Sequence, residues 1–193
     1  MKKILSTIIF LLATFQATAT EWVSFGRGEE CERYASLFII EYPSDFFFSP
    51  KSMIFPVDYK GPRARYEPPH ILVLESEKRA FHIVALPLWG NFISPETART
   101  LTVEETIDFV KKGIVSPTIE RREHCTLVHG VAGGPGSRTV YEAYFVENDV
   151  PKGYGVMVQR VRFVYDTRVS QIDPVIMEII SRFKSIWDRD DME

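Results

Sequence analysis

After its first nineteen residues, the chain has no apolar run long enough to cross a membrane. A spanning helix needs about 20 predominantly apolar residues in succession, and no later segment approaches that length. We therefore predict that the mature chain has no integral membrane segment. The sequence also lacks internal repeats and low-complexity tracts, and its 193 residues are typical of a single globular domain.

An excess of positive charge is missing as well. Lys and Arg together number 23 against 26 Asp and Glu residues, which gives a formal net charge of -3. A mildly acidic chain has no general attraction for nucleic-acid phosphates, and this one has no polybasic segment for anionic lipids. Nucleic acids are therefore not expected as partners.

The first nineteen residues have the order of a secretory signal peptide. Lys2 and Lys3 form a short positive region, and Ile4 to Phe15 is apolar apart from small hydroxyl residues. Ala17-Thr18-Ala19 then matches the small-x-small pattern that signal peptidase requires. We predict cleavage after Ala19 and a periplasmic or secreted mature protein. An uncleaved membrane anchor is the alternative, but the apolar run is short for a spanning helix.

Cysteine is scarce, with only Cys31 and Cys125 in the chain. An exported protein folds in an oxidising compartment, where an even number of cysteines favours disulfide formation. Closing so long a loop stabilises a fold by about 4 kcal/mol in the chain-entropy model. Cys31 and Cys125 are therefore a candidate disulfide. Two separate thiols are the alternative, because the sequence gives no distances.

Short runs of β-forming residues recur through the mature chain. They predict strands or extended segments over Ser36–Tyr42, Phe46–Phe48, Ile71–Leu74, Ala80–Leu86, Cys125–Val131, Thr139–Val146 and Gly155–Tyr165. The first two flank a turn at Pro43-Ser44-Asp45 and are expected to form a hairpin or a sharp corner. In the last run, Arg160 and Arg162 share one face and alternate with apolar residues, which is typical of a sheet with one wet side.

Two helices are indicated. Thr102-Val103-Glu104-Glu105 matches a capping box, and apolar residues follow at helical spacing before Gly113. Asp173-Pro174 is a strong helix start, followed by an apolar stripe that reaches Trp187. The order of elements predicts an α+β fold, a mostly antiparallel β-sheet covered by two amphipathic helices. The predicted organisation is a signal peptide (1–19), a leading segment (20–35), a single domain (36–187) and an acidic tail (188–193).

No residue pattern predicts a catalytic, cofactor or metal site. His124 and His129 are five residues apart, so on one strand they point to opposite faces. Cys125 and His129 share a face but lie about 13 Å apart, whereas zinc ligands lie within about 2.3 Å of the ion. A nucleophile pair of Cys125 with a histidine is disfavoured, because catalytic partners usually meet through the fold. Gly133-Gly134-Pro135-Gly136 precedes a strand-like run instead of a helix, which favours a hairpin loop over a phosphate cradle.

The segment from Phe46 to Phe55 is unusually apolar for a region that leads into a Pro-rich stretch. Contiguous exposed apolar surface marks partner sites, so Phe47, Met53 and Phe55 are candidate partner contacts. Strand alternation favours a simpler interpretation, in which Phe46 and Phe48 fill the core and Phe47 is exposed.

Three local patterns carry a family resemblance. Phe38-Ile-Ile-Glu-Tyr-Pro-Ser-Asp45 is similar to an opening hairpin, the Thr102–Gly113 helix precedes a strand triplet, and Ile179–Lys184 is similar to a terminal helix. Together with the order of elements, over residues 36–187, these resemble the PsbP/Mog1-like (DcrB-like) α/β/α sandwich family. The sequence departs from it at Phe46, where a Trp is usual, and in its Pro-rich stretch. The resemblance implies a binding or accessory role without a shared catalytic motif.

These observations predict an exported, non-enzymatic binding or accessory protein, which interacts with another envelope protein or an apolar ligand and needs no cofactor. Two alternatives stay open. A hydrolase-type enzyme with an unrecognised site requires titratable residues such as His82, Glu142, Arg160 and Arg162 to meet in a pocket. A self-assembling surface component requires a large apolar face.

Overall fold

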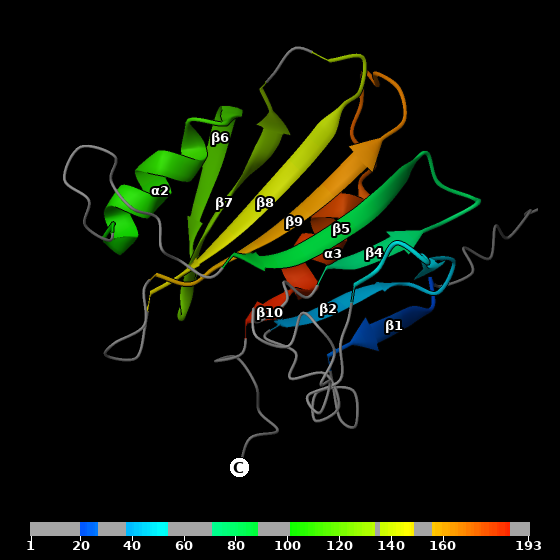
Figure 1. Ribbon diagram of the computed structural model, residues 1–193, viewed down its shortest axis with the longest axis horizontal. Coiled ribbons are helices and arrows are strands. Elements are labelled where there is room, and N and C mark those ends of the chain that lie inside the picture. The colour runs from blue at the N-terminus through cyan, green and yellow to red at the C-terminus, as the bar shows by residue number, and fades with distance from the viewer. Residues whose placement is uncertain are drawn as a thin grey trace, which may run out of the picture.

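A seven-stranded antiparallel sheet runs through the computed structural model (Figure 1). The structure describes residues 20–26, 38–53, 71–88, 101–133, 136–148 and 156–185. Within these ranges the strands lie, from one edge to the other, in the order β3 (Phe47–Phe48), β4 (Leu72–Glu75), β5 (Phe81–Leu88), β9 (Val158–Tyr165), β8 (Val140–Glu147), β7 (Cys125–Ala132) and β6 (Ile114–Arg121). The predicted antiparallel pairing is confirmed at every junction of this sheet.

A second, three-stranded sheet contains β1 (Trp22–Phe25), β2 (Phe38–Pro43) and β10 (Lys184–Ser185), with β2 in the middle. The sequence predicts neither β1 nor β10. The apolar stripe of the second predicted helix reaches Trp187, but in the structure that helix ends at Arg182 and the chain then pairs with β2 at Lys184–Ser185. β1 falls in the leading segment, where Trp22 packs against the Arg182 guanidinium, 4.1 Å from the ring centroid.

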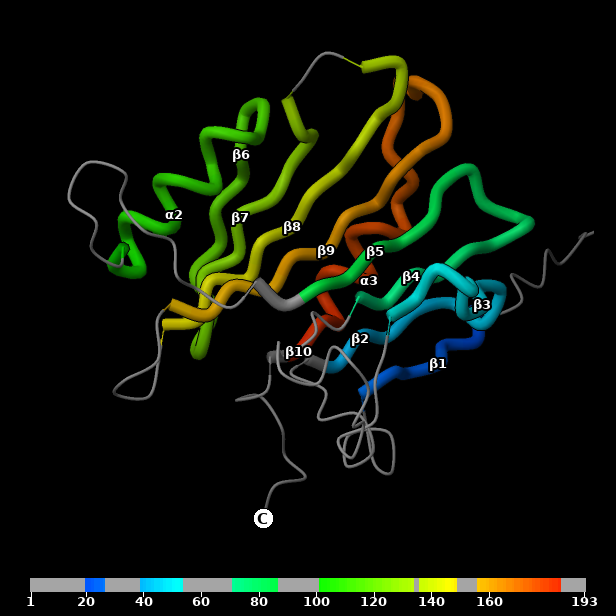
Figure 2. The backbone as a smooth tube through the Cα atoms, in the orientation of Figure 1, coloured from blue at the N-terminus to red at the C-terminus, as the bar shows by residue number. Residues whose placement is uncertain are grey.

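The sequence leaves two arrangements open for the predicted segments Ser36–Tyr42 and Phe46–Phe48. The hairpin is wrong, because β2 and β3 pair in different sheets, and the sharp corner is right. The chain turns after β2 and joins the edge of the larger sheet as β3 (Figure 2).

The helix α3 (Val175–Arg182) covers one face of the large sheet, which we call the α3 face. Its buried residues Val175, Ile176, Ile179 and Ile180 pack with the apolar residues of the central strands and of β2. In β9, Val161, Phe163 and Tyr165 point to this side, as their alternation predicts. Each fully buried aliphatic side chain contributes about 1.5–3 kcal/mol, so this layer is the main apolar core.

The helix α2 (Val103–Lys111) packs against the opposite face, which we call the α2 face. Its predicted capping box is confirmed: Thr102 accepts a hydrogen bond from the Glu105 backbone, and the Glu105 carboxylate accepts one from the Thr102 backbone. Ile107 and Val110 are buried in a smaller cluster with residues of β7, β8 and β9. The α+β class is therefore confirmed, with one helix on each face of the large sheet (Figure 1).

The strand β6 follows α2 almost at once and is missing from the predicted elements. Most of its side chains are exposed, Pro117 interrupts it, and its pairing with β7 shifts between Val115 and Thr118. A strand is predicted from the alternation of apolar and polar residues. An exposed edge strand with a bulge lacks that alternation, so the sequence does not reveal it. Opposite the bulge, Gly130 has a φ of +155°, and a Cβ there would lie 2.6 Å from Ile114 Cγ2. Glycine is needed for this close approach.

An ion-pair cluster joins the β2–β3 turn, the β4–β5 turn and the segment that precedes α3. The Arg79 guanidinium donates to Asp45 at 2.9 Å and lies 3.4 Å from Asp173, which precedes α3. Burial alone would raise the pKa of Asp45, but the Arg79 guanidinium and the Ser76 hydroxyl hold it below its usual value. Asp173 also accepts a hydrogen bond from the Val175 backbone, as expected of the residue that starts this helix. The cluster therefore fixes the start of α3 relative to the β4–β5 turn.

The helices in the described ranges include none with both the length and the apolar character needed to cross a membrane.

Candidate functional site

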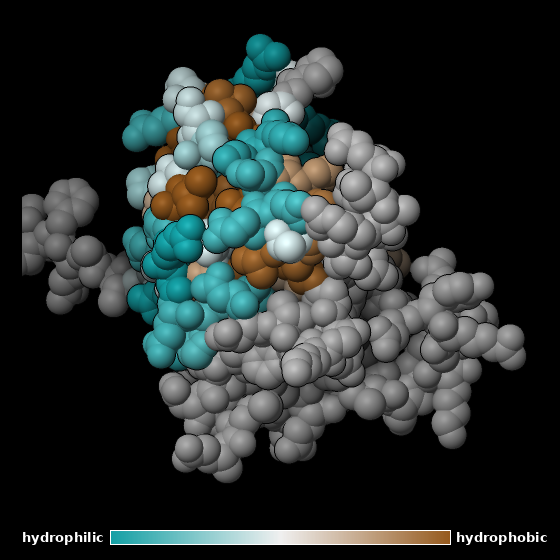
Figure 3. All heavy atoms as spheres, turned by 90° about the vertical axis from the view of Figure 1, so that its left-hand side faces the viewer, coloured by the Kyte–Doolittle hydropathy of each residue, from teal (hydrophilic) through white to brown (hydrophobic). Residues whose placement is uncertain are grey.

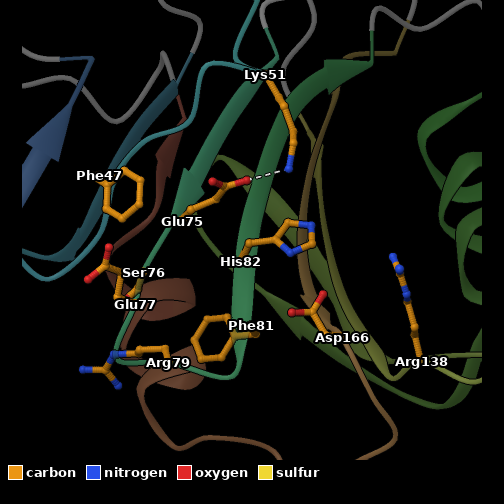
Figure 4. A pocket seen from close by; sticks show the side chains of 10 residues that line it. All are labelled: Phe47, Lys51, Glu75, Ser76, Glu77, Arg79, Phe81, His82, Arg138 and Asp166. Atoms are coloured by element: carbon orange, nitrogen blue, oxygen red, sulfur yellow. Dashed lines mark hydrogen bonds and ion pairs between the residues drawn. The ribbon is translucent and has the colours of Figure 1, made fainter.

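A pocket of about 490 Å³ opens at the β3 end of the large sheet. Strands β3, β4 and β5 and the loops around them supply its lining residues, which are Phe47, Lys51, Glu75, Ser76, Glu77, Arg79, Phe81, His82, Arg138 and Asp166. Figure 4 shows Phe47 at one side and Arg138 at the other, with Glu75 and His82 between them. The strand pairings explain this arrangement, because Phe47 is opposite Glu75 and His82 is opposite Val164.

Charged groups of both signs line the pocket. Lys51 Nζ lies 2.8 Å from Glu75 Oε1, and the Lys51 side chain is 77% exposed. On the other side of His82, Asp166 and Arg138 come from the chain just after β9 and just before β8 (Figure 4). Such a site offers contacts to both acidic and basic groups of a ligand, together with the aromatic surface of Phe47.

The imidazole of His82 is partly buried in this pocket. Desolvation lowers its pKa below the ordinary 6.5, because burial disfavours the charged imidazolium. The carboxylates of Asp166 and Glu75 oppose the shift, and the cations of Lys51 and Arg138 add to it. The folded state therefore favours neutral His82. The stability that this preference contributes is present above about pH 6.5 and is lost as the pH falls toward the lower folded pKa.

We expect an NMR titration of the His82 ring to give a midpoint below 6.5. Asp166→Asn removes a carboxylate that favours the imidazolium and should lower the midpoint further. Arg138→Gln removes an opposing cation and should raise it. Arg121→Gln, on the far edge strand, is the matched control and should leave the midpoint in place. A His82 midpoint above 6.5 would contradict the burial that the structure shows.

Of the two predicted partner contacts that the structure describes, Phe47 and Met53, one lines the pocket. Phe47 is 47% exposed and lines it. Met53 is half-buried and pairs with Ile71 in an isolated bridge, and Phe55 lies outside the described residues. The alternation expected for this segment is wrong at Phe48, which is 45% exposed and packs edge-on against Phe25 of the second sheet.

Cys31 and Cys125 stay a candidate disulfide, with two separate thiols as the alternative. Cys125 is buried at the start of β7, on the α3 face, and Cys31 lies outside the described residues. Among the described residues, no three His, Cys, Asp or Glu side chains come together in a way that could hold a metal ion. His129 is instead a buried strand residue, with Nδ1 2.8 Å from the Tyr141 hydroxyl and Nε2 3.1 Å from Glu120.

A second group of polar residues lies on the α2 face, on strands β8 and β9. Glu142 of β8 is buried and forms ion pairs with Arg160 and Arg162 of β9, the latter at 2.9 Å between Arg162 Nε and Glu142 Oε1. The Tyr144 hydroxyl donates to Glu142 Oε2 at 2.6 Å. Burial raises the pKa of Tyr144 well above its usual value, so the hydroxyl stays protonated and able to donate. We call Glu142, Tyr144, Arg160 and Arg162 the arginine cluster.

The arginine cluster contains three of the four residues proposed for an unrecognised enzyme site. Val84 of β5 pairs with Arg162, and Arg162 pairs with Glu142 in the next strand. His82 lies on β5 two residues from Val84 and belongs to the pocket, with a different set of charged neighbours. Tyr144 is not identified from the sequence, although its spacing of two from Glu142 places both side chains on one face.

Comparison of the chain with models of known families, with curated proteins and with solved structures found no match. The fold and the site define an α+β protein with a polar pocket at one end of its sheet. The function is therefore inferred from the chemistry of the described residues.

Proposed function

We propose that this chain is an exported, non-enzymatic binding or accessory protein, which meets another envelope protein at Phe47 and the adjacent pocket. In this proposal the leader is removed after Ala19 and the mature protein works in the periplasm or outside the cell. The observation that carries it is the pair Phe47 and Phe48, each nearly half exposed on a two-residue strand at the sheet edge.

An exposed aromatic pair beside charged groups has the composition of a protein contact. Protein interfaces are enriched in aromatic residues, and their central anchors are surrounded by polar groups. Phe47 supplies an apolar anchor, and Lys51, Glu75, Arg138 and Asp166 supply a polar surround of mixed sign. A partner of matching charge pattern would gain orientation from these groups and affinity from Phe47.

Photo-crosslinking in intact cells tests this proposal. A photoreactive phenylalanine analogue is placed at position 47 and, as a control, at Val115, which is 59% exposed on the distant edge strand β6. We expect a discrete adduct from position 47 alone, recovered in the envelope or periplasmic fraction, with the mature N-terminus at Thr20. Equal labelling from both positions would contradict a specific contact at Phe47. An unprocessed chain in the cytosol would contradict the export step.

We also propose the finer PsbP/Mog1-like (DcrB-like) sandwich arrangement for this fold. Its support is the placement of α2 and α3 on opposite faces of an antiparallel sheet, in the chain order that the resemblance implies. Most members of that family bind other molecules and do not catalyse reactions, which agrees with the binding role proposed here.

The hydrolase alternative has weaker support. Both oxygens of Glu142 already accept from Tyr144 or face guanidinium groups, so the carboxylate has little capacity left to take a proton from a substrate. His82, the other candidate base, lies in the pocket and not in the arginine cluster. The two candidate bases, Glu142 and His82, therefore lie in different sites.

The self-assembly alternative needs a continuous apolar face. Exposed apolar side chains do occur near the α2 and β6 end, among them Phe109, Val115 and Ile119. Figure 3 shows this end of the molecule, where hydrophilic residues interrupt the apolar ones. This interrupted pattern favours contact with a different partner over extensive self-association.

A further inference from the structure

We propose that the arginine cluster is an oxyanion-binding site, in which Arg160 and Arg162 receive a carboxylate or phosphate group of a ligand. Glu142 and Tyr144 act as positioning residues that hold the two guanidinium groups. This site lies on the α2 face, and it is separate from the protein contact proposed at Phe47.

The charges of the cluster do not balance. Two guanidinium groups share one carboxylate, so the cluster carries a net positive charge. The Glu142 side chain is 4% exposed, whereas those of Arg160 and Arg162 are 25% and 35% exposed. The negative charge therefore lies inside and the positive charges lie toward solvent. A partly buried, uncompensated cation is costly, and an anion from solution would compensate it.

The cluster also has unused hydrogen-bond donors. A guanidinium has five N–H donors, and Arg160 contacts Glu142 through Nη2 alone. The Nε atoms of both arginines are enclosed and have no hydrogen-bond acceptor. Arg162 Nε lies close to Glu142 Oε1, but the pair is an electrostatic contact whose alignment is too poor for a hydrogen bond. The enclosed Nε atoms are shielded from solvent, so an oxyanion would be received by the Nη groups of the two partly exposed guanidiniums, in charge-assisted hydrogen bonds.

The two arginines are held in place before any ligand arrives. They are two residues apart on β9, so they share a face with their Cα atoms about 6.6 Å apart. The Arg160 guanidinium lies over the Tyr144 ring, 5.3 Å from its centroid, and Tyr144 is in turn bonded to Glu142. Ordering a flexible arginine normally costs side-chain entropy on binding, and this arrangement reduces that cost.

Side-chain NMR of the mature protein tests the site. Inorganic phosphate and acetate are titrated separately, in an uncharged buffer at constant ionic strength, while the Nε–H signals of Arg160 and Arg162 are followed. We expect saturable shifts with at least one anion, and which anion binds more tightly identifies the ligand group as phosphate or carboxylate. Arg162→Gln should weaken binding about tenfold or more, the usual effect of losing a charge-assisted hydrogen bond.

Two further variants test how the charge of Glu142 and the fork of Arg162 affect anion binding. Glu142→Gln keeps the size of the side chain and removes the competing negative charge, so it should strengthen anion binding severalfold. Arg162→Lys keeps the charge and loses the fork, so its affinity should lie between those of Arg162→Gln and the unchanged protein. Arg121→Gln changes the net charge equally on the exposed β6 edge and should have no effect. Absence of saturable shifts with both anions, or weaker binding by Glu142→Gln, would overturn the proposal.

Discussion

Glu142→Ala is expected to lower the free energy of unfolding by about 3 kcal/mol. The substitution leaves Arg160 and Arg162 without their shared carboxylate, and removing one partner of a buried ion pair costs about 3–5 kcal/mol. The lower end applies because both guanidinium groups are partly exposed and can be hydrated. Urea denaturation of the mature protein, followed by circular dichroism, measures the change.

Two comparisons show whether this loss comes from charge or from packing. Glu142→Gln retains an acceptor for the arginines and for Tyr144, so it should cost less than Glu142→Ala. The triple replacement Glu142→Leu, Arg160→Met and Arg162→Met removes all the charges at once. Apolar replacement of a whole buried ion-pair group is often neutral or stabilising. If the triple variant were less stable than Glu142→Ala, the cluster would be a stability element, contrary to our interpretation.

The expected stability of the triple variant bears on the role of the cluster. A group of four polar residues that apolar side chains can replace without loss is not needed to hold the sheet together. Its presence then requires another reason, and recognition of an anion provides one. Stability and anion affinity should accordingly change independently in the variants, with Glu142→Gln lower in stability and higher in affinity.

The central strands and both helices of this fold could be predicted from the sequence because their signals are local. Alternation in β9 separates Arg160 and Arg162 from their apolar neighbours, and the capping box at Thr102 marks the start of α2. Strands β1, β6 and β10 are not predicted from the sequence. They form through pairing at an edge, and they are short or rich in polar residues. Their existence depends on a neighbouring strand, and no local pattern contains that information.

The candidate sites are harder to predict from the sequence, because their residues also meet through strand pairing and not through a local pattern. The exposure of Phe47 follows from strand alternation, but Phe48 is exposed because the chain changes sheets between β2 and β3. Asp166 and Arg138 reach the pocket from loops distant in sequence from His82. Arg162 meets Glu142 only because of the register between β8 and β9. Register over a long connection depends on the packing of the whole sheet.

Phe145→Ala is expected to cost about 3–5 kcal/mol of unfolding free energy, the usual range for removing a buried phenylalanine. Phe145 is 1% exposed on the α3 face. Its ring stacks on that of Phe183 at the end of α3, with centroids 4.0 Å apart, and the Arg122 guanidinium lies 5.4 Å from its centroid. The loss should appear as a lower urea midpoint, because the cavity separates α3 from β8.

Phe47→Ala is the matched control, since the same atoms are removed from an exposed position. Its effect on stability should lie within about 0.5 kcal/mol, as for most surface substitutions. Its effect on the partner should be large, because an exposed aromatic anchor contributes to binding and not to the core. A Phe47→Ala variant as unstable as Phe145→Ala would mean that Phe47 packs into the fold. The proposed contact at Phe47 would then be wrong.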